Sequence, residues 1–146
     1  MKMILQSDEN AWRLARLGAA TTSRWADIVA RTKSGPAASR KNYLSELVTE
    51  RLTGSPSDNG FTSGPMQWGI DHEPAAKLAY EFTHGAEVGP SGFVLHPTIA
   101  YAGASPDGLV NDDGQMEVKC PNTSTHLASL MHGEISDRYI IQMQGQ

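Results

Sequence analysis

The feature that most constrains this chain is the block Ser105–Pro121, which reads S-P-D-G-L-V-N-D-D-G-Q-M-E-V-K-C-P. In its middle, Asn111–Gly114 is a turn-forming run that ends in glycine. The runs on either side, Gly108–Val110 and Gln115–Lys119, have the pattern of short strands. The block therefore predicts a hairpin whose two strands lie side by side.

The predicted hairpin gathers charged side chains at one end. Asp107 precedes the first strand and Glu117 lies in the second, so the turn brings the two carboxylates alongside each other. Alternate side chains of a strand share a face, which places Lys119 on the same face as Glu117. The opposite face is apolar and suits a protein core; its members are Met116, Val118 and Cys120.

Such a cluster has a defined chemistry. Two close carboxylates repel each other unless a proton or a cation lies between them. Carboxylate oxygens favour Mg²⁺, with Mn²⁺ as an alternative, and such a metal activates a bound water and screens the charge of a phosphodiester. Lys119 would orient the attacking water or stabilise charge on the phosphate. The cluster thus predicts hydrolysis of a phosphodiester in DNA or RNA.

The alternative interpretation is a polar hairpin with a surface ion pair, which is common and adds little stability. The turn between the acids and the apolar residues on the opposite face favour the site. Other chemistries lack their motifs: no C-x-x-C or H-E-x-x-H indicates zinc, and no G-x-x-x-x-G-K-[ST] indicates ATP. No G-x-S-x-G indicates an acyl hydrolase.

Helices precede and follow the predicted strands, an order typical of α+β or three-layer α/β folds. One point stays open in the helix Met66–Phe82: Pro74 either lies inside it or marks a break, with a new helix beginning at Asp71. In the second case Glu73 is a first-turn acid. The other expected helices are Asp8–Leu17, Arg24–Ala30, Ser39–Leu52, Asn122–Met131 and one from Ser136 or Asp137; further strands are Gly92–His96 and Thr98–Ala104.

Helix Met66–Phe82 is also expected to bury an apolar stripe. Its members are Trp68, His72, Ala75, Ala76, Ala79 and Phe82.

Composition places the 146 residues in one domain without a transmembrane span or signal peptide. The single cysteine excludes an internal disulfide and, with the other features, predicts a cytoplasmic protein. Residues 1–51 hold nine Lys/Arg against five Asp/Glu, whereas residues 52–146 hold three against eleven. A basic first part and an acidic second part suit a protein that grips phosphate with one and binds metal with the other; the alternative is a solvated helical surface.

Five blocks, in order, resemble the phage lambda exonuclease family of YqaJ-like viral recombinases, within the PD-(D/E)xK nuclease superfamily. They are W-R-L-A-R-L-G-A-A-T-T-S (12–23), M-Q-W-G-I-D-H-E-P-A-A-K-L-A-Y-E (66–81), A-S-P-D-G-L (104–109), M-E-V-K-C-P (116–121) and Y-I-I-Q-M-Q (139–144). The resemblance implies a restriction-endonuclease-like α/β core, with a central mixed sheet flanked by helices. It divides one nuclease domain, 1–146, into a basic helical part (1–53), a loop (54–65) and a catalytic core (66–146).

The resemblance also assigns roles to individual residues. It makes Asp107 and Glu117 metal ligands together with the backbone carbonyl of Val118, and Lys119 the catalytic lysine. Further residues that match functional positions of the family are Glu73 and Gln142 at the catalytic site, and Arg16, Ser23 and Ser105 at the 5′-phosphate of the DNA.

The implied activity is Mg²⁺-dependent 5′→3′ digestion of one strand at duplex DNA ends in phage or prophage recombination. The implied partners are two further copies in a homotrimer and a single-strand annealing protein. The family's catalytic domain continues beyond the Gln142 helix with a strand and closing helices, and the chain stops at Gln146, so we expect an incomplete core. Two alternatives remain: an endonuclease of the same superfamily, or a catalytically silent remnant that binds only DNA or a partner.

Overall fold

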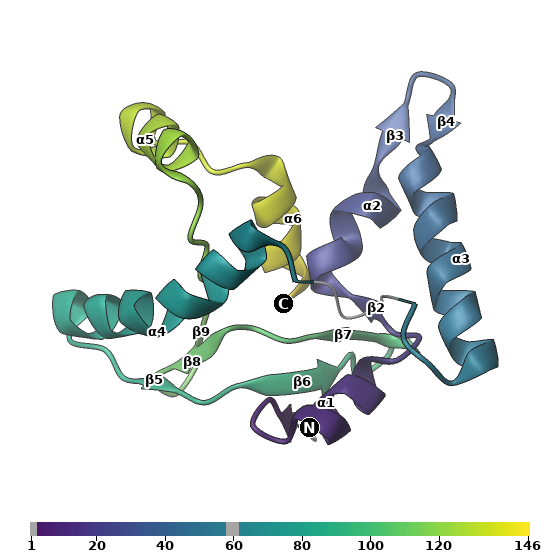
Figure 1. The fold of residues 1–146 in the computed structure, drawn as a ribbon, viewed down its shortest axis with the longest axis horizontal. Helices are drawn as coiled ribbons and strands as arrows, with labels where there is room; N and C mark the ends of the chain where they lie inside the picture. Colours follow the sequence, from purple (N-terminus) through teal and green to yellow (C-terminus); the bar gives the residue numbers. More distant parts are fainter. Residues whose placement is uncertain (1–2, 58–61) are drawn as a thin grey trace. The chain divides into compact units, whose positions relative to one another are not determined.

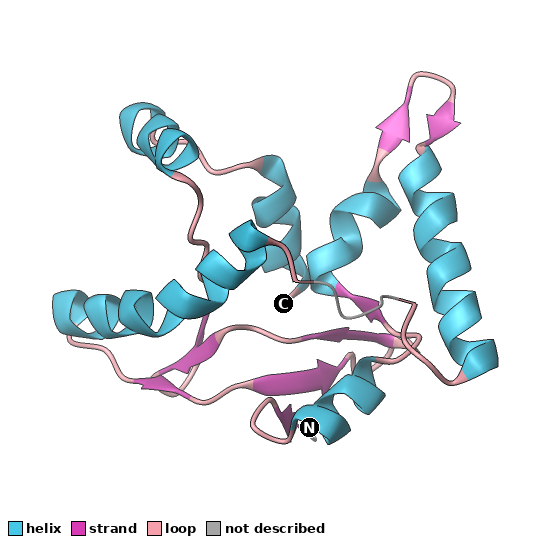
Figure 2. Ribbon diagram, in the orientation of Figure 1, coloured by secondary structure: helices cyan, strands magenta, loops and turns pink. Residues whose placement is uncertain are grey.

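The computed structural model describes residues 3–57 and 62–146 (Figures 1 and 2). The described residues form two compact units. The first, here called the N-terminal unit, holds residues 3–57, 91–105 and 137–146; the second, here called the hairpin unit, holds residues 62–90 and 106–136. Part of the predicted loop 54–65, residues 58–61, lies outside the described residues.

The N-terminal unit is built on a mixed four-stranded sheet in the order β1-β6-β7-β2. Neighbours β1 and β6, and β6 and β7, run antiparallel, whereas β7 and β2 run parallel. Phe93 is fully buried in this sheet, and a Cβ at Gly103 would lie 2.4 Å from its ring, so only glycine fits there. The strands are β1 (Met3–Leu5), β2 (Ala20–Thr21), β6 (Gly92–Leu95) and β7 (Ala102–Ala104).

Helices complete the N-terminal unit. Its first helix begins where the Asp8 carboxylate accepts a hydrogen bond from the Ala11 amide (3.2 Å). The third helix packs against the second, and the last packs against the second and the short 3₁₀ turn before it. These elements are α1 (Glu9–Arg16), η1 (Thr22–Arg24), α2 (Trp25–Val29), the small hairpin β3 (Arg31–Thr32) and β4 (Gly35–Pro36), α3 (Ala38–Thr53) and α6 (Asp137–Gly145).

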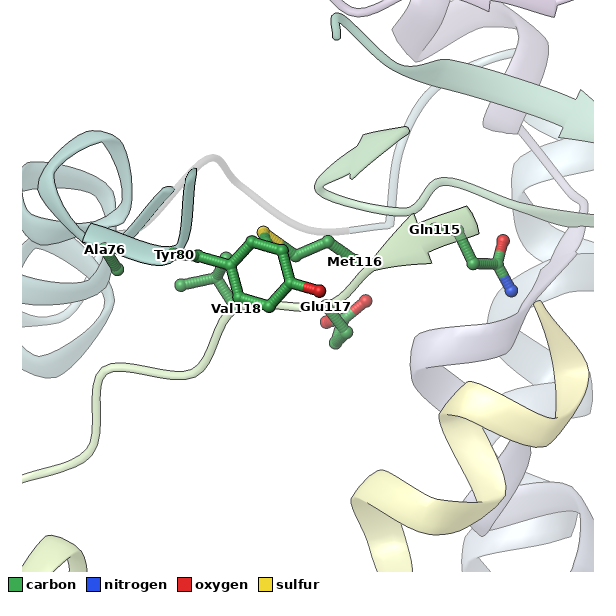
Figure 3. Close-up of a pocket in the computed structure, with 6 residues that line it drawn as sticks. All are labelled: Ala76, Tyr80, Gln115, Met116, Glu117 and Val118. Atoms are coloured by element: carbon green, nitrogen blue, oxygen red, sulfur yellow. The ribbon is translucent and has the colours of Figure 1, made fainter. Parts of the chain in front are cut away.

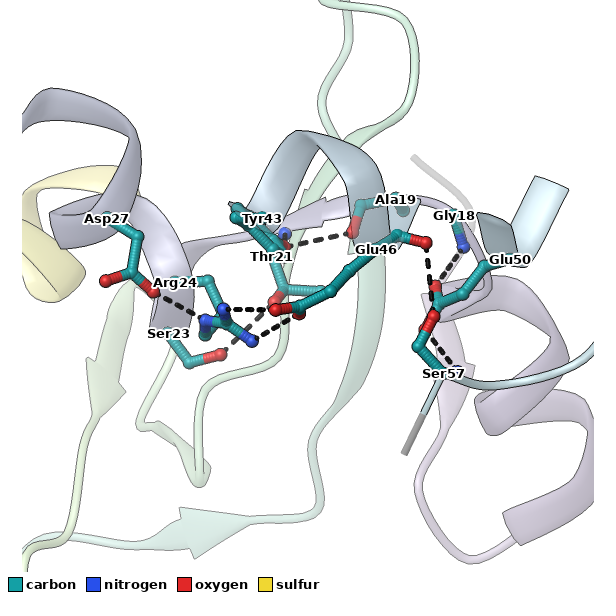
Figure 4. A network of polar contacts seen from close by, with 10 residues as sticks. All are labelled: Gly18, Ala19, Thr21, Ser23, Arg24, Asp27, Tyr43, Glu46, Glu50 and Ser57. Carbon is teal, nitrogen blue, oxygen red and sulfur yellow. Dashed lines mark hydrogen bonds and ion pairs between the residues drawn. The ribbon is translucent and has the colours of Figure 1, made fainter. Parts of the chain in front are cut away.

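Tyr43 of α3 ties this helix to the sheet. Its buried hydroxyl accepts a hydrogen bond from the Thr21 amide (3.0 Å) and donates one to the Ala19 carbonyl (3.4 Å) (Figure 4). The Arg24 guanidinium lies 4.3 Å from the Tyr43 ring centroid and pairs with Glu46 at 3.0 Å. A buried hydroxyl with both partners and a stacked cation fix α3 on β2.

The hairpin unit combines a long helix with a three-stranded antiparallel sheet in the order β5-β8-β9. Ser63 caps the helix by accepting a hydrogen bond from the Met66 amide (3.4 Å), and Gly85 ends it in the left-handed conformation. The elements are α4 (Gly64–His84), β5 (Val88–Gly89), β8 (Gly108–Val110), β9 (Gly114–Met116) and α5 (Thr123–His132).

The mixed α/β class is confirmed, with a mixed sheet and flanking helices, and each predicted helix is present within a few residues. Two predicted strands are too long. The strand expected over Gln115–Lys119 ends at Met116, and the one over Thr98–Ala104 begins only at Ala102. In the second case Tyr101 has a φ of 60°, a left-handed conformation that no strand accommodates.

Helix α4 settles the open point at Pro74 and corrects one expectation. The helix continues through Pro74, so the alternative of a new helix beginning at Asp71 is not observed. The predicted buried stripe is also largely exposed: Trp68 is an exposed residue, and Phe82 retains 93% of its accessible surface. Strands β1, β2 and β5 were not anticipated, because two or three residues carry no periodicity of their own.

None of the helices within residues 3–57 and 62–146 combines the length and apolar character that a membrane crossing requires.

Gly18 ends α1 in a conformation that α3 clamps. Its φ is +65°, and its amide donates to Glu50 Oε2 (2.8 Å) (Figure 4). Its carbonyl accepts a hydrogen bond from Arg51 Nε (2.8 Å). The Arg51 guanidinium in turn lies 3.9 Å from the Tyr101 ring centroid. An added Cβ at Gly18 would lie 2.4 Å from Arg51 Cγ.

We expect Gly18→Ala to destabilise the chain more than Gly54→Ala does. Gly54 has the same φ with open space around it, so alanine there costs only the backbone penalty of about 1 kcal/mol. At Gly18, alanine must also displace Arg51 and its hydrogen bond, which adds about 1 kcal/mol or more. Urea unfolding of the two variants measures this difference; equal losses would show that the clamp is unimportant.

Candidate active site

The pairing of β8 with β9 positions the two acids of the hairpin. Gly108 pairs with Met116, and the Asp107 amide donates to the Met116 carbonyl (2.9 Å), so Asp107 lies beside Glu117 as predicted. The connection between the strands is held by Asn111, whose φ of 50° is left-handed. Its amide donates to the Glu87 carbonyl, and its side chain accepts from the Glu87 amide, both at 3.0 Å. The turn is therefore anchored to the segment before β5.

Asp107 is half-buried and carries an unfavourable charge. Its pKa is raised to about 6. Burial is the main cause, and the negative charges of Glu117 and Glu73 contribute to the same shift. Two interactions oppose this: the Val118 amide donates to Oδ2 at 2.6 Å, and Lys119 attracts the carboxylate. A bound cation would therefore stabilise the ionised Asp107, because the positive charge of Lys119 offsets only part of these unfavourable effects.

Glu117 and Lys119 form an ion pair. The Glu117 side chain is nearly buried, at 5% of its accessible surface, whereas Lys119 retains 36%. Strand β9 ends at Met116, before both residues. The Glu117 and Lys119 side chains nevertheless contact each other, so they lie on the same side of the segment that follows β9. A buried carboxylate thus has its lysine partner at the solvent edge of the site.

Helix α4 contributes the third acid. Glu73 forms an ion pair with Lys77 at 2.5 Å and lies close enough to Asp107 to raise its pKa. At helical spacing, Glu73, Ala76, Lys77 and Tyr80 share one face of α4. The structure therefore brings Asp107 close to the Glu117–Lys119 pair and to Glu73, the residues that the resemblance to the family assigns to one site.

An open pocket of about 320 Å³ adjoins this cluster. Met116 and Val118 line it, which corrects the expectation that their face belongs to a closed core; both are half-buried, as is Cys120. The apolar residues instead form the wall of a space that Glu117 also borders (Figure 3). The complete lining is Ala76, Tyr80, Gln115, Met116, Glu117 and Val118.

The donor set suits a hard divalent cation. Asp107 and Glu117 offer carboxylate oxygens, and the extended segment places the backbone of Val118 between them and Lys119. Among the described residues no group of three or more Asp, Glu, His or Cys side chains is arranged to hold a metal ion, so a cation here would depend on Asp107, Glu117, backbone and solvent oxygens. Mg²⁺ is bound in this way in phosphoryl-transfer sites, where one or two carboxylates leave room for water and phosphate oxygens. A cation would also relieve the repulsion around Asp107.

A second group of predicted residues lies in the N-terminal unit. The Arg16 guanidinium lies 4.3 Å from the Trp12 ring centroid and 5.9 Å from that of Phe93. Burial lowers the pKa of Arg16, whereas the charges of Tyr43 and Glu50 raise it. Trp12 Nε1 also donates to Ser105 Oγ (3.0 Å), so the indole brings Arg16 and Ser105 together.

Ser23 and Gln142 belong to the same unit. The Ser23 hydroxyl bonds the Thr21 hydroxyl (3.2 Å) in the turn η1. Gln142 is buried on α6, the helix that packs against η1 and α2. Sequence reasoning missed the linking role of Trp12, for which no local signal exists. It also missed Tyr80, although its spacing of seven residues from Glu73 places it on the same helical face.

We expect Asp107→Asn to stabilise the metal-free protein at alkaline pH. A carboxyl whose folded pKa is raised loses stability as pH rises from its unfolded value near 4 through about 6. The compared quantity is the free energy of unfolding of the variant minus that of wild type. Allowing for partial exposure, this difference should be about 1–2 kcal/mol more favourable to the variant at pH 8 than at pH 4. Urea unfolding with EDTA at both pH values measures this. Asp112→Asn, in the exposed turn, is the control; the same change for both variants would contradict the prediction.

Comparisons with known proteins identify the family of this chain. The YqaJ-like viral recombinase domain matches residues 11–146. Two solved structures, of the alkaline exonuclease LHK-Exo from Laribacter hongkongensis and of LHK-Exo in complex with dAMP, are 47% identical to this chain, with TM-scores of 0.83 and 0.84. Each alignment covers 94% of this chain and 66% of the solved one, so the chain spans slightly less than two thirds of LHK-Exo. A search of curated proteins finds no match. The extent of the match to the domain shows that this chain belongs to the family of YqaJ-like viral recombinase domains.

Proposed function

We propose that this chain carries the catalytic centre of a metal-dependent 5′→3′ exodeoxyribonuclease that acts on duplex DNA ends in phage or prophage recombination. The observation that carries the proposal is the cluster around Asp107. A half-buried carboxylate with a raised pKa lies beside the buried Glu117, and Lys119 is the cation next to them. This arrangement suits the binding of Mg²⁺, with Mn²⁺ as the alternative, and of a phosphate.

Each residue of the cluster has a role in this mechanism. Asp107, Glu117 and the Val118 carbonyl hold the metal, which activates a water and screens the charge of the phosphodiester. The Val118 amide fixes the Asp107 carboxylate by its 2.6 Å hydrogen bond. Lys119, at the solvent edge, orients the attacking water or stabilises the charge that develops on the phosphate.

Glu73 and Gln142 are the two further residues to which the resemblance assigns a catalytic role. Glu73 adds negative charge that acts on Asp107, and its pairing with Lys77 keeps the side chain in place. Gln142 is buried, so its amide would act from a fixed position on α6. The similarity to LHK-Exo, an alkaline exonuclease with a solved structure in complex with dAMP, supports both the reaction class and a deoxynucleotide product.

The N-terminal unit supplies the proposed 5′-phosphate site. Arg16 is a half-buried cation stacked on Trp12, and the same indole holds the Ser105 hydroxyl. A guanidinium and the Ser105 hydroxyl held by the same indole match the donor requirements of a phosphate, and the Ser23 hydroxyl in η1 is the further donor that the resemblance assigns. In this proposal the enzyme is cytoplasmic and works as a homotrimer with a single-strand annealing protein.

A second candidate is a role in binding DNA or a partner without turnover. The exposed apolar side chains of α4 and α5, among them Phe82, Leu78 and Met131, favour it, because such residues mark surfaces that another chain covers. An endonuclease of the same superfamily remains the alternative within enzymes. Covalently closed DNA distinguishes it, since an exonuclease requires an end.

The direct test is digestion of linear and covalently closed duplex DNA with Mg²⁺ or with EDTA. We expect Mg²⁺-dependent loss of the 5′-phosphorylated strand of the linear substrate only. Asp107→Asn should abolish cleavage because a metal ligand is lost, and Lys119→Ala should lower kcat by about 10²-fold or more with little change in DNA affinity. Cleavage of closed circles would establish the endonuclease, and DNA binding without cleavage by the folded chain would establish the second candidate.

Arg16→Ala should remove the preference for a 5′-phosphate. Single-turnover digestion of 5′-phosphorylated and 5′-hydroxyl duplexes measures this preference, which we expect to fall at least about tenfold in the variant. Arg13→Ala is the matched control, because Arg13 lies on the same helix in an exposed ion pair with Glu9. An unchanged preference in Arg16→Ala would place the phosphate site elsewhere.

A further inference from the structure

The pocket between α4 and β9 has a composition that the proposed metal chemistry does not use. Its apolar lining consists of the Tyr80 ring, the Ala76 methyl and the side chains of Met116 and Val118 (Figure 3). Gln115 and Glu117 are its polar members. A metal site needs none of the apolar groups, so their presence beside Glu117 requires another explanation.

The lining favours a flat apolar ligand over an anion. Lysine and arginine are absent among the described residues that line the pocket, and Glu117 would repel a phosphate there. A pocket lined by an aromatic ring, a thioether and an isopropyl group instead offers surfaces on which a nucleobase can stack. The volume of about 320 Å³ is at the lower end of the range for small-molecule sites and accommodates one nucleoside.

The position of Tyr80 fits this use. Its side chain retains 37% of its accessible surface, so the ring faces open space and is not consumed by packing. The His84 ring lies against it, with centroids 4.5 Å apart and a 40° tilt, which limits the orientations of the phenol. Glu73, two turns earlier on the same face of α4, lies close enough to Asp107 to raise its pKa. Helix α4 therefore carries both Glu73, near the proposed position of the scissile phosphate, and Tyr80, whose ring lines the adjoining pocket.

We propose that this pocket is the subsite for a nucleobase adjoining the scissile phosphate, with Tyr80 as the stacking residue. The inference rests on the proposed nuclease function and extends it to the substrate's base. Stacking tolerates all four bases, since each has an aromatic face, so the subsite suits digestion that ignores sequence.

The test compares ligands that differ only in the base. The binding of dAMP and of 2-deoxyribose 5-phosphate to the full chain is titrated with Ca²⁺ as the metal, in wild type, Tyr80→Ala, Tyr80→Leu and Tyr80→Phe. We expect wild type to bind dAMP about five- to a hundredfold more tightly than the sugar phosphate. Tyr80→Phe should keep this ratio, whereas Tyr80→Leu and Tyr80→Ala should reduce it towards one.

Phe82→Ala is the matched control, because this aromatic residue lies on the same helix and is 93% exposed outside the pocket. It should leave the ratio unchanged. A ratio that is the same in wild type and Tyr80→Leu would overturn the proposal, and so would equal losses in Phe82→Ala. Tyr80→Leu retains apolar volume, so a folding defect of the alanine variant does not obscure the result.

A second measurement separates this proposal from the nuclease function. Duplexes with an abasic nucleotide at the first or the second position of the 5′ end are digested by wild type and Tyr80→Leu. We expect the missing base and the missing ring to have non-additive effects at one of these positions. Normal cleavage with fully additive effects would reject the subsite and keep the nuclease; no cleavage by wild type would reject the nuclease, while the dAMP titration still tests the pocket.

Discussion

The pairing of β8 with β9 is the constraint on which the candidate site depends. It aligns Gly108 with Met116, and this register leaves Asp107 and Glu117 as neighbours beyond the ladder. The Asp107 carboxylate then accepts the Val118 amide at 2.6 Å, which extends the pairing past the last strand residue. A shift of one residue would turn the Glu117 side chain to the opposite face and separate the acids. The charge cluster is therefore a product of backbone register.

The negative charge of this cluster is only partly balanced by the residues around it. Burial and two other acids act on Asp107, and Lys119 offsets them only in part. The same burial that raises the pKa of the carboxyl would strengthen its interaction with a bound cation, because fewer waters compete. Function in such a site comes at the expense of stability in the metal-free state, as is common where like charges converge.

The N-terminal unit holds its functional side chains by different means. Arg16 is placed by aromatic rings, and the turn that follows its helix is clamped at Gly18 by Glu50 and Arg51 of α3. Both the backbone amide and the backbone carbonyl of Gly18 are hydrogen-bonded to side chains of α3, and these two bonds fix the turn after α1. The expectation of a single nuclease domain stays a prediction, since the two units are described separately.

The sequence by itself determined the local features: the capped helices, the hairpin turn, the neighbouring Asp107 and Glu117, and the Glu117–Lys119 pair. These depend on residues a few positions apart, where periodicity and turn chemistry act directly. Only the tertiary structure decided the rest: the passage of α4 through Pro74, the bond from Trp12 to Ser105 across 93 residues, and the open pocket where a core was expected. Long-range contacts leave no local pattern, because the partner that buries or exposes a side chain is remote in the chain.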